Sequence, residues 1–480
     1  MRPSLRRSCA ACAKSKHSCD LRTPRCSRCN KRKIECVYAN QPLTASLPSP
    51  SREAQSGLVT RYPGSHGLVA GHSFGSLDPF ESYPQTKLSR AHVQRLIHSF
   101  LHKIAFQYYP LDLDANSNPF LVSWWPLALG DPALFHVSLQ TACLDEERSA
   151  QKGFESSEIL MADSVVLLRH KIEDAALAIQ DGTINTVITL ATIEFGKGNI
   201  DVSQMHISGV KRLVDLRGGI NAIRQTSPLT ARMVSWVSML IMGKPQFPVQ
   251  TDDGIGSGIP PIPEWHSEMP DMQWHETGFG DIEIDLDVAI VLVRLRGICL
   301  QTRVAPLPTA RLHDLTCYVI HRLLLSDPED KHDQFSPATQ AVRYAIILYM
   351  LVTHGPTYYP HDGMLHMILS KFRASLEGFK ETSRNHGALD VWLIAVGMVV
   401  ASNTPHYQWF ATEAQAIAMS LQLVQWHDIL QHMHSMIWID TPHGEAIFRP
   451  HWLAFLPRPE GVPPFDNTWT PAFHDTDKKP

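Results

Sequence analysis

Apolar residues recur at steps of three and four positions along most of the chain from about Leu88 onward. This spacing places them on one face of an α-helix and predicts amphipathic helices. The first segment contains Leu88, Val93, Leu96, Ile97, Phe100, Leu101 and Ile104. Further helices are predicted over residues 131–143, 159–179, 185–195, 205–216, 229–242, 290–300, 311–325, 339–351, 364–376, 388–401 and 412–436. Alternating strand patterns are scarce, so we expect a large all-α domain of roughly a dozen or more helices over residues 87–460.

Residues 41–86 lack this helical period. They are rich in Pro, Ser and Gly, which is typical of a flexible linker. Leu43, Leu47, Leu58 and Leu68 keep no heptad spacing and are interrupted by prolines, so no coiled-coil zipper is expected. The sequence therefore does not exclude a homodimer, but it contains no zipper that would join two chains. The pattern leaves residues 1–40 as a separate N-terminal module and 461–480 as a tail.

Charge separates the same two regions. The whole chain has a formal net charge of -4, but residues 1–36 carry eleven Lys and Arg against two acids, a balance of +9. The remainder therefore carries −13. A short basic module joined to an acidic body indicates a polyanionic partner at one end only.

Composition limits the class of protein further. Of the 480 residues, 44% are hydrophobic, which is normal for a globular protein with a sizeable core. No apolar run of about 18 residues occurs, so no transmembrane helix or membrane partner is expected. The N-terminus lacks the apolar core of a secretory signal. In a reducing compartment, clustered cysteines are better explained as metal ligands than as disulfides.

The cysteines of the basic module form an internal repeat. Six of the nine cysteines are Cys9, Cys12, Cys19, Cys26, Cys29 and Cys36. The first three positions become the last three on adding 17, so each half is a C-x2-C pair with a third cysteine seven residues on. Each half thus offers three thiolates, one fewer than a tetrahedral Zn²⁺ requires.

Two Zn²⁺ ions satisfy this arrangement if two thiolates bridge both metals. The symmetric solution uses the first cysteine of each half, Cys9 and Cys26, as the bridges. One ion would take Cys9, Cys12, Cys19 and Cys26. The other would take Cys9, Cys26, Cys29 and Cys36. A module of about 30 residues cannot bury enough apolar surface to fold alone, so metal binding must supply its folding free energy.

Further motifs accompany these cysteines. Pro24 stands just before Arg25-Cys26, and the repeat ends in Cys36-Val37-Tyr38. With these features, residues 9–36 resemble the zinc binuclear cluster family of fungal transcription factors. The helical body contains degenerate markers over residues 90–250, among them Asn118-Pro119 and Leu216-Arg217-Gly218-Gly219. It resembles the fungal-specific transcription factor domain, which implies a regulatory role.

The resemblance implies a fold and a set of DNA contacts. It implies a small zinc-stabilised DNA-binding module, with two short helices around a binuclear zinc cluster, beside a large all-α regulatory domain. Lys16 falls on the family's base-reading lysine, with Lys14 as its neighbour, and lysine can donate to O6 and N7 of guanine in a CGG triplet. The remaining basic residues are assigned to DNA phosphates: Arg25, Arg28, Lys31, Arg32 and Lys33.

Judged by charge alone, the second half of the module would be the half that enters the DNA groove. Ala13, Ser15 and Ser18 stand where family members often carry basic residues, whereas residues 28–33 are rich in charge. We follow the resemblance, because phosphate contacts need charge whereas base contacts need placement. Arg2, Arg6 and Arg7, together with the basic residues of the second half, could also serve nuclear import.

Three motifs suggest other chemistry but lack its structural context. Residues 71–75 match the G-x-S-x-G nucleophile elbow, yet they lie in the linker. The glycines at 254, 256 and 258 are followed by prolines rather than by the helix that a phosphate cradle needs. Three histidines at 427, 432 and 434 lie close in sequence, but proximity is expected in a chain with 25 histidines.

Residues 245–293 contain ten acids and no Lys or Arg. Trp265, Trp274 and Phe279 are interleaved with the acids, as in amphipathic activation segments. A solvated loop between helices explains the same composition.

The sequence therefore predicts a nuclear, sequence-specific regulator of RNA polymerase II genes in a fungus, with no enzymatic activity. Double-stranded DNA is the expected partner and two Zn²⁺ ions are the expected cofactors. Whether a coactivator or corepressor also binds is left open. Control of a metabolic or biosynthetic gene cluster is a further hypothesis. The alternatives are a zinc-containing adaptor protein and a hydrolase with a zinc appendage.

Overall fold

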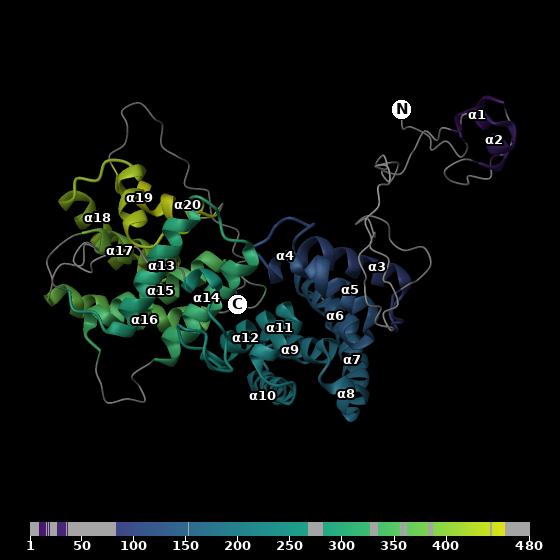
Figure 1. Cartoon of the computed structure of the whole chain (residues 1–480), viewed down its shortest axis with the longest axis horizontal. Helices are drawn as coiled ribbons and strands as arrows, with labels where there is room; N and C mark the ends of the chain where they lie inside the picture. The colour runs from purple at the N-terminus through teal and green to yellow at the C-terminus, as the bar shows by residue number, and fades with distance from the viewer. Residues whose placement is uncertain are drawn as a thin grey trace, which may run out of the picture. The chain divides into compact units, whose positions relative to one another are not determined.

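The fold comes from a computed structural model, which describes residues 9–15, 17, 19, 26–34, 36, 83–151, 153–266, 282–326, 335–355, 358, 362–382, 387–441 and 444–456. The chain divides into two compact units between Phe74 and Gly75 (Figure 1). Each unit is considered by itself below. Residues 71–75, which match the nucleophile elbow, lie outside the described residues.

The N-terminal unit contains two short helices, α1 (Ala10–Lys14) and α2 (Ser27–Arg32), which pack against each other. The regular elements in the described part of the C-terminal unit are helices, and its β pairing there is a single isolated bridge between Val249 and Ile259. The expected fold class, a small module with two short helices and a large all-α domain, is confirmed.

The C-terminal unit begins with the following helices: α3 (Arg90–Ser99), η1 (Phe100–Ile104), α4 (Ala105–Tyr108), η2 (Phe120–Trp124), α5 (Trp125–Gly130), α6 (Pro132–Ser149), α7 (Glu155–Glu173), α8 (Ala175–Ala178), α9 (Asp181–Gly196), α10 (Ile200–Leu216), α11 (Ile220–Thr226) and α12 (Pro228–Met242). It continues with η3 (Pro263–His266), α13 (Leu286–Thr302), α14 (Thr309–Leu325), α15 (Pro337–His354), α16 (Asp362–Thr382), α17 (Ala388–Ala401), α18 (Tyr407–Ser420), α19 (Trp426–Ser435) and α20 (Gly444–Leu453).

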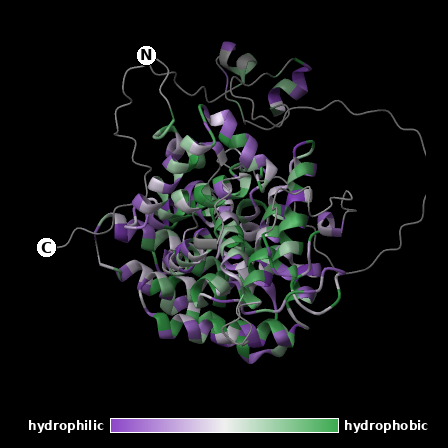
Figure 2. Cartoon of the chain, turned by 90° about the vertical axis from the view of Figure 1, so that its left-hand side faces the viewer, coloured by the Kyte–Doolittle hydropathy of each residue, from purple (hydrophilic) through white to green (hydrophobic). Residues whose placement is uncertain are grey.

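A series of buried helices forms the centre of this unit. Helices α6, α9, α12, α14, α15 and α17 pack successively, each against the next. They are apolar on most faces, as expected for helices surrounded by others, and α17 is buried along almost its whole length. Amphipathic helices such as α10 and α16 cover the outside, so hydrophobic residues concentrate in the interior (Figure 2).

Two helices predicted as continuous are broken, which corrects the sequence interpretation. The predicted helix 159–179 divides into α7 and α8 at Asp174, whose carboxylate accepts hydrogen bonds from the N–H groups of Ala176 and Leu177. The predicted helix 412–436 divides into α18 and α19. There Gln422 adopts a left-handed conformation, with φ of 53°, and Gln425 forms a capping box with Asp428. In both places side-chain hydrogen bonds cap the start of a new helix, so the chain breaks there although the apolar period continues.

The acidic stretch 245–293 is partly built into the core. Trp265 is 1% exposed, and its indole N–H donates to Asp252 at 2.7 Å, while Asp252 also pairs with Arg322. Trp265 therefore cannot serve as an exposed anchor for a coactivator. Trp274 and Phe279 lie outside the described residues, and activation by this stretch stays a prediction.

Close packing between α17 and α18 gives a test of the fold. A Cβ added at Gly397 would overlap the ring of Phe410, so Gly397→Ala should destabilise the protein by about 1–3 kcal/mol through overpacking. Gly209→Ala on α10 is the matched control, because a Cβ there meets nothing within 4 Å. It should leave stability unchanged or raise it by up to about 1 kcal/mol. Urea unfolding measures both, and equal effects would refute this packing.

Candidate metal centre and nucleic-acid interface

The two halves of the cysteine repeat adopt the same local structure. Cys9 directly precedes α1, and Cys26 is the N-cap of α2. The backbone N–H of Cys12 donates to Cys9 Sγ at 3.4 Å, and that of Cys29 donates to Cys26 Sγ at 3.4 Å. Each sulfur thus satisfies an N–H group that a helix N-terminus leaves unpaired. Both helices therefore begin on the cysteines that the symmetric solution chose as bridges.

The end of α2 turns the chain back toward the cluster. Lys33 adopts a left-handed conformation with φ of 52°, and the N–H of Ile34 donates to the carbonyl of Cys29 at 3.2 Å. Cys36 then reaches the start of the same helix, where its sulfur accepts a hydrogen bond from the N–H of Cys26 at 3.3 Å. This turn places Cys36, the last cysteine of the second half, beside Cys26, the first cysteine of that half.

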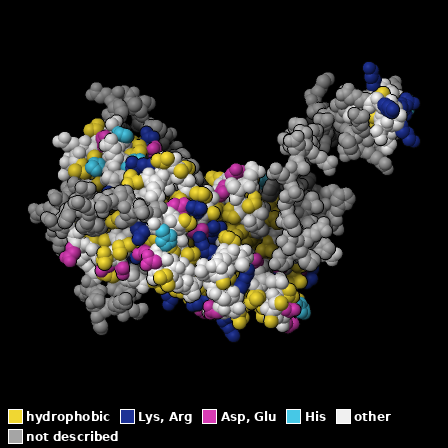
Figure 3. Space-filling view, in the orientation of Figure 1, with side chains coloured by type: hydrophobic (Ala, Val, Ile, Leu, Met, Phe, Trp, Pro, Cys, Tyr) yellow, Lys and Arg dark blue, Asp and Glu magenta, His cyan; other side chains and the backbone are white. Residues whose placement is uncertain are grey.

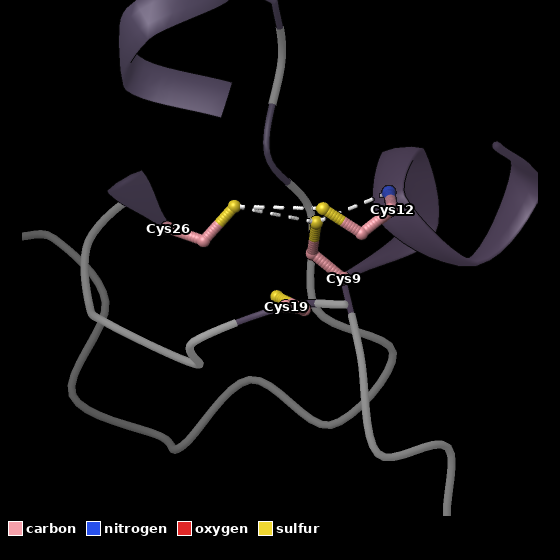
Figure 4. A group of neighbouring side chains, drawn as sticks. All are labelled: Cys9, Cys12, Cys19 and Cys26. Carbon is pink, nitrogen blue, oxygen red and sulfur yellow. Dashed lines mark hydrogen bonds between the residues drawn. The ribbon is translucent and has the colours of Figure 1, made fainter. Parts of the chain in front are cut away.

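The six sulfurs form two groups of four that share two members. One group is Cys9, Cys12, Cys19 and Cys26, shown in Figure 4. The other is Cys9, Cys26, Cys29 and Cys36. Within each group all sulfurs lie within 4.8 Å of one another. The groups have the same members as the two ligand sets predicted from the spacing, and the shared pair is Cys9 and Cys26.

The distances between sulfurs fit zinc. A Zn–S bond of about 2.3 Å gives a tetrahedron whose sulfurs are about 3.8 Å apart. The Cys9–Cys26 distance is 3.8 Å, Cys12–Cys26 is 3.7 Å and Cys9–Cys29 is 3.6 Å. These distances are far longer than a disulfide bond of about 2.05 Å, and all six cysteines are free. The Cys9–Cys26 line is then an edge common to both tetrahedra.

Burial raises the pKa values of three of the thiols, so a metal ion must displace their protons to bind. Burial raises the pKa of Cys12 to about 12, and hydrogen bonds among the neighbouring thiols add to the rise. Burial also raises the pKa values of Cys9 and Cys29. Without a cation these three thiols would therefore hold their protons at neutral pH. A bound Zn²⁺ displaces these protons, because zinc binds thiolates.

Four of the seven basic residues predicted to contact DNA are exposed on the surface of the module. Lys14 is exposed on the last turn of α1; Lys31 and Arg32 are exposed on the last turn of α2, and Lys33 is exposed directly after it. Arg28 on α2 is half-buried. Figure 3 shows Lys and Arg side chains projecting from this unit. Lys16 and Arg25 lie outside the described residues, so their predicted contacts stay predictions.

Family models match both units. Residues 7–45 match the fungal Zn(2)-Cys(6) binuclear cluster domain. Residues 95–243 match the fungal specific transcription factor domain. These two matches support a fungal zinc cluster transcription regulator. Both resemblances drawn from the sequence are thereby confirmed. Searches of the curated proteins and of the solved structures found no match for the regulator.

The other motifs in the regulator do not assemble sites within its described part. Gly254 and Gly256 have positive φ angles in a tight turn, where Gln250 donates to the carbonyl of Gly256 at 2.8 Å. His427 pairs with Gln431 on α19, and the groups of three or more metal-ligating side chains found among the described residues consist of the six cysteines. No helix in the described ranges is long and apolar enough to cross a bilayer.

The helical unit contains a charged cluster that no sequence motif indicates. Asp314 on α14 is 3% exposed and accepts hydrogen bonds from two arginines, Arg224 on α11 and Arg232 on α12. These arginines lie 90 and 82 positions away in sequence. No motif spacing links residues so far apart, and only the packing of α11, α12 and α14 brings them together.

Proposed function

We propose that this regulator binds double-stranded DNA sequence-specifically through a cluster of two Zn²⁺ ions and controls RNA polymerase II genes in the nucleus. The observation that carries the proposal is the pair of four-sulfur groups sharing Cys9 and Cys26. Each group offers four ligands to one ion, so six thiolates hold two ions. The exposed basic residues on α1 and α2 supply the charge that a phosphate backbone attracts.

Within the module, we assign base recognition to the first half and phosphate contact to the second. Lys16 would donate to O6 and N7 of guanine in a CGG triplet, with Lys14 beside it. Arg25, Arg28, Lys31, Arg32 and Lys33 would contact phosphates. The exposure of the last three at the end of α2 supports this role, because long cationic side chains there reach the DNA backbone without desolvation inside the module.

The assignment predicts different salt and sequence dependence for the two halves. Lys16→Ala should reduce the free energy of binding to a CGG-containing site by roughly 1–3 kcal/mol, and the free energy of binding to random DNA by far less. Replacing any one of Lys31, Arg32 and Lys33 by alanine should weaken binding to both DNAs by the same factor. It should also reduce the magnitude of the slope of log affinity against log salt by about one unit. Equilibrium binding of the full chain to both duplexes across a salt series measures these effects.

Zinc content must be equal in all variants, so that lost affinity reports a contact rather than a lost fold. Asn30→Ala, an exposed neutral position on α2, is the control for surface change without charge. Should Lys31 or Arg32 carry the sequence preference while Lys16 does not, the second half enters the groove and the assignment is inverted.

For the rest of the chain, we propose residues 1–40 as the DNA-binding domain, 41–86 as a linker, 87–460 as the regulatory domain and 461–480 as a tail. The helical unit would then regulate transcription through an effector, a coactivator or corepressor, or a second copy of the chain. We also propose that the protein controls a metabolic or biosynthetic gene cluster and has no enzymatic activity of its own.

A further inference from the structure

His17 follows α1 in the half of the module assigned to base recognition, two positions before Cys19. Its backbone N–H donates to the carbonyl of Cys12 at 3.0 Å and so satisfies a carbonyl at the C-terminal end of the helix. Its side chain is exposed. An exposed imidazole thus lies within three sequence positions of both lysines assigned to the bases, Lys14 and Lys16.

The backbone holds one ring nitrogen of His17. Its Nδ1 is hydrogen-bonded to the carbonyl oxygen of Ser15. A carbonyl oxygen can only accept, so Nδ1 carries the proton and donates. In a neutral imidazole the other nitrogen, Nε2, is then an acceptor without a proton. Nε2 has no partner in the described part of the module, and this acceptor is therefore available to a bound molecule.

The side chains next to His17 differ from it in what they can offer. The hydroxyl of Ser15 donates to the carbonyl of Ala11 at 2.8 Å, so its proton is already used within the module. Lys14 is exposed, and its ammonium group has donors only. This half of the module therefore presents a cationic donor together with the acceptor Nε2 of His17.

We propose that His17 reads a base by accepting a hydrogen bond from the amino group of a cytosine in the recognised triplet. This inference rests on the proposed function, in which the first half of the module enters the major groove at a CGG site. Each G·C pair presents there two acceptors, guanine O6 and N7, and one donor, the N4 amino group of cytosine. Lysine can bind only the acceptors, whereas Nε2 of His17 can bind the donor. A phosphate has no donor for Nε2, so the base edge is the better match.

Duplexes that lack one amino group test the proposal. Each cytosine of the CGG site is replaced in turn by 2-pyrimidinone, which has no amino group, and binding of the zinc-loaded full chain is measured at one fixed pH. One of these replacements should weaken binding of the unaltered protein about three- to tenfold, as the loss of a single hydrogen bond allows. His17→Ala should weaken binding to the intact site by a similar factor. It should then be insensitive to that replacement, because both changes remove the same bond.

Two further variants keep the test specific. His17→Asn can still donate to the carbonyl of Ser15 but lacks Nε2, so it should behave like His17→Ala, and it takes the place of His17→Ala if that variant loses zinc. Asn30→Ala, at an exposed position on α2, is the control and should keep the full sensitivity to each replacement. Neither His17 variant should change the slope of log affinity against log salt, because a neutral contact to a base releases no counterion.

The outcomes separate this inference from the proposed function. Should the protein prefer CGG to random DNA while the His17 variants stay as sensitive to every replacement as the unaltered protein, His17 does not read a cytosine. A salt slope reduced by about one unit in His17→Ala would show a phosphate contact instead and would also overturn the inference. An unaltered protein without any preference for CGG would overturn the proposed function together with it.

Discussion

Replacing Cys9 or Cys26 by alanine should release both metal ions and unfold the N-terminal module, whereas replacing Cys12 or Cys36 should weaken chiefly one ion. The two four-sulfur groups share Cys9 and Cys26, so each of these sulfurs completes both tetrahedra. Among the described residues of the module, the buried core consists of Cys9, Cys12, Cys26 and Cys29, so the cysteines supply most of the stability seen there. Metal binding contributes on the order of ten kcal/mol in modules of this kind, so loss of both ions leaves it unfolded.

Zinc analysis of the purified full chain measures this prediction. The unaltered protein should contain about two Zn²⁺ ions per chain, as expected for six thiolates with two bridges. Cys143→Ala is the matched control, because Cys143 is a buried cysteine in the helical unit, far in sequence from the cluster, and its loss should leave the zinc content unchanged. One ion in the unaltered protein, or loss of both ions from Cys12→Ala alone, would refute the shared arrangement.

Asp314→Asn should produce a large loss of stability in the helical unit. The substitution keeps the shape of the side chain but removes the single negative charge that both Arg224 and Arg232 contact. Breaking a buried ion pair typically costs about 3–5 kcal/mol, because the remaining charge is left without compensation. The arginine side chains are 24% and 15% exposed, so water relieves part of this cost and we expect a value near the lower end of that range.

Urea unfolding followed by tryptophan fluorescence measures the change in the free energy of unfolding. Asp215→Asn on α10 removes an exposed carboxylate and serves as the control, with an expected effect within about 0.5 kcal/mol. Adding Arg224→Met to Asp314→Asn should restore part of the lost stability, since it removes one uncompensated charge. No difference between Asp314→Asn and Asp215→Asn would show that the cluster adds nothing to the fold.

The metal centre could be predicted closely from the sequence because it is a local structure. Its six ligands lie within 28 consecutive residues, and each C-x2-C pair fits the first turn of a short helix. Spacing alone therefore gave the two sets of four that the folded chain brings together, with Cys9 and Cys26 in both. The positions of Lys16 and Arg25 relative to DNA do not follow from spacing in this way, and they stay predictions.

The existence of the long helices also followed from the sequence, whereas several of their ends did not. The apolar period predicted 388–401, and α17 occupies those residues. The period continues through Asp174 and through Gln422, where the structure breaks the helix. It reports which face of a segment is buried, but side-chain hydrogen bonds at both places, and a left-handed residue at Gln422, decide where the helix stops.

Only the tertiary structure decided what the buried polar and aromatic residues of the helical unit do. Trp265, which the sequence grouped with an activation segment, is buried against Tyr318 and bonded to Asp252. Asp314 meets two arginines from helices more than 80 residues earlier. Periodicity and spacing act over a few turns of one segment, whereas these contacts depend on how separate helices pack. Pairing between distant charges leaves no regular mark along the chain, so only the folded helices reveal this charged cluster.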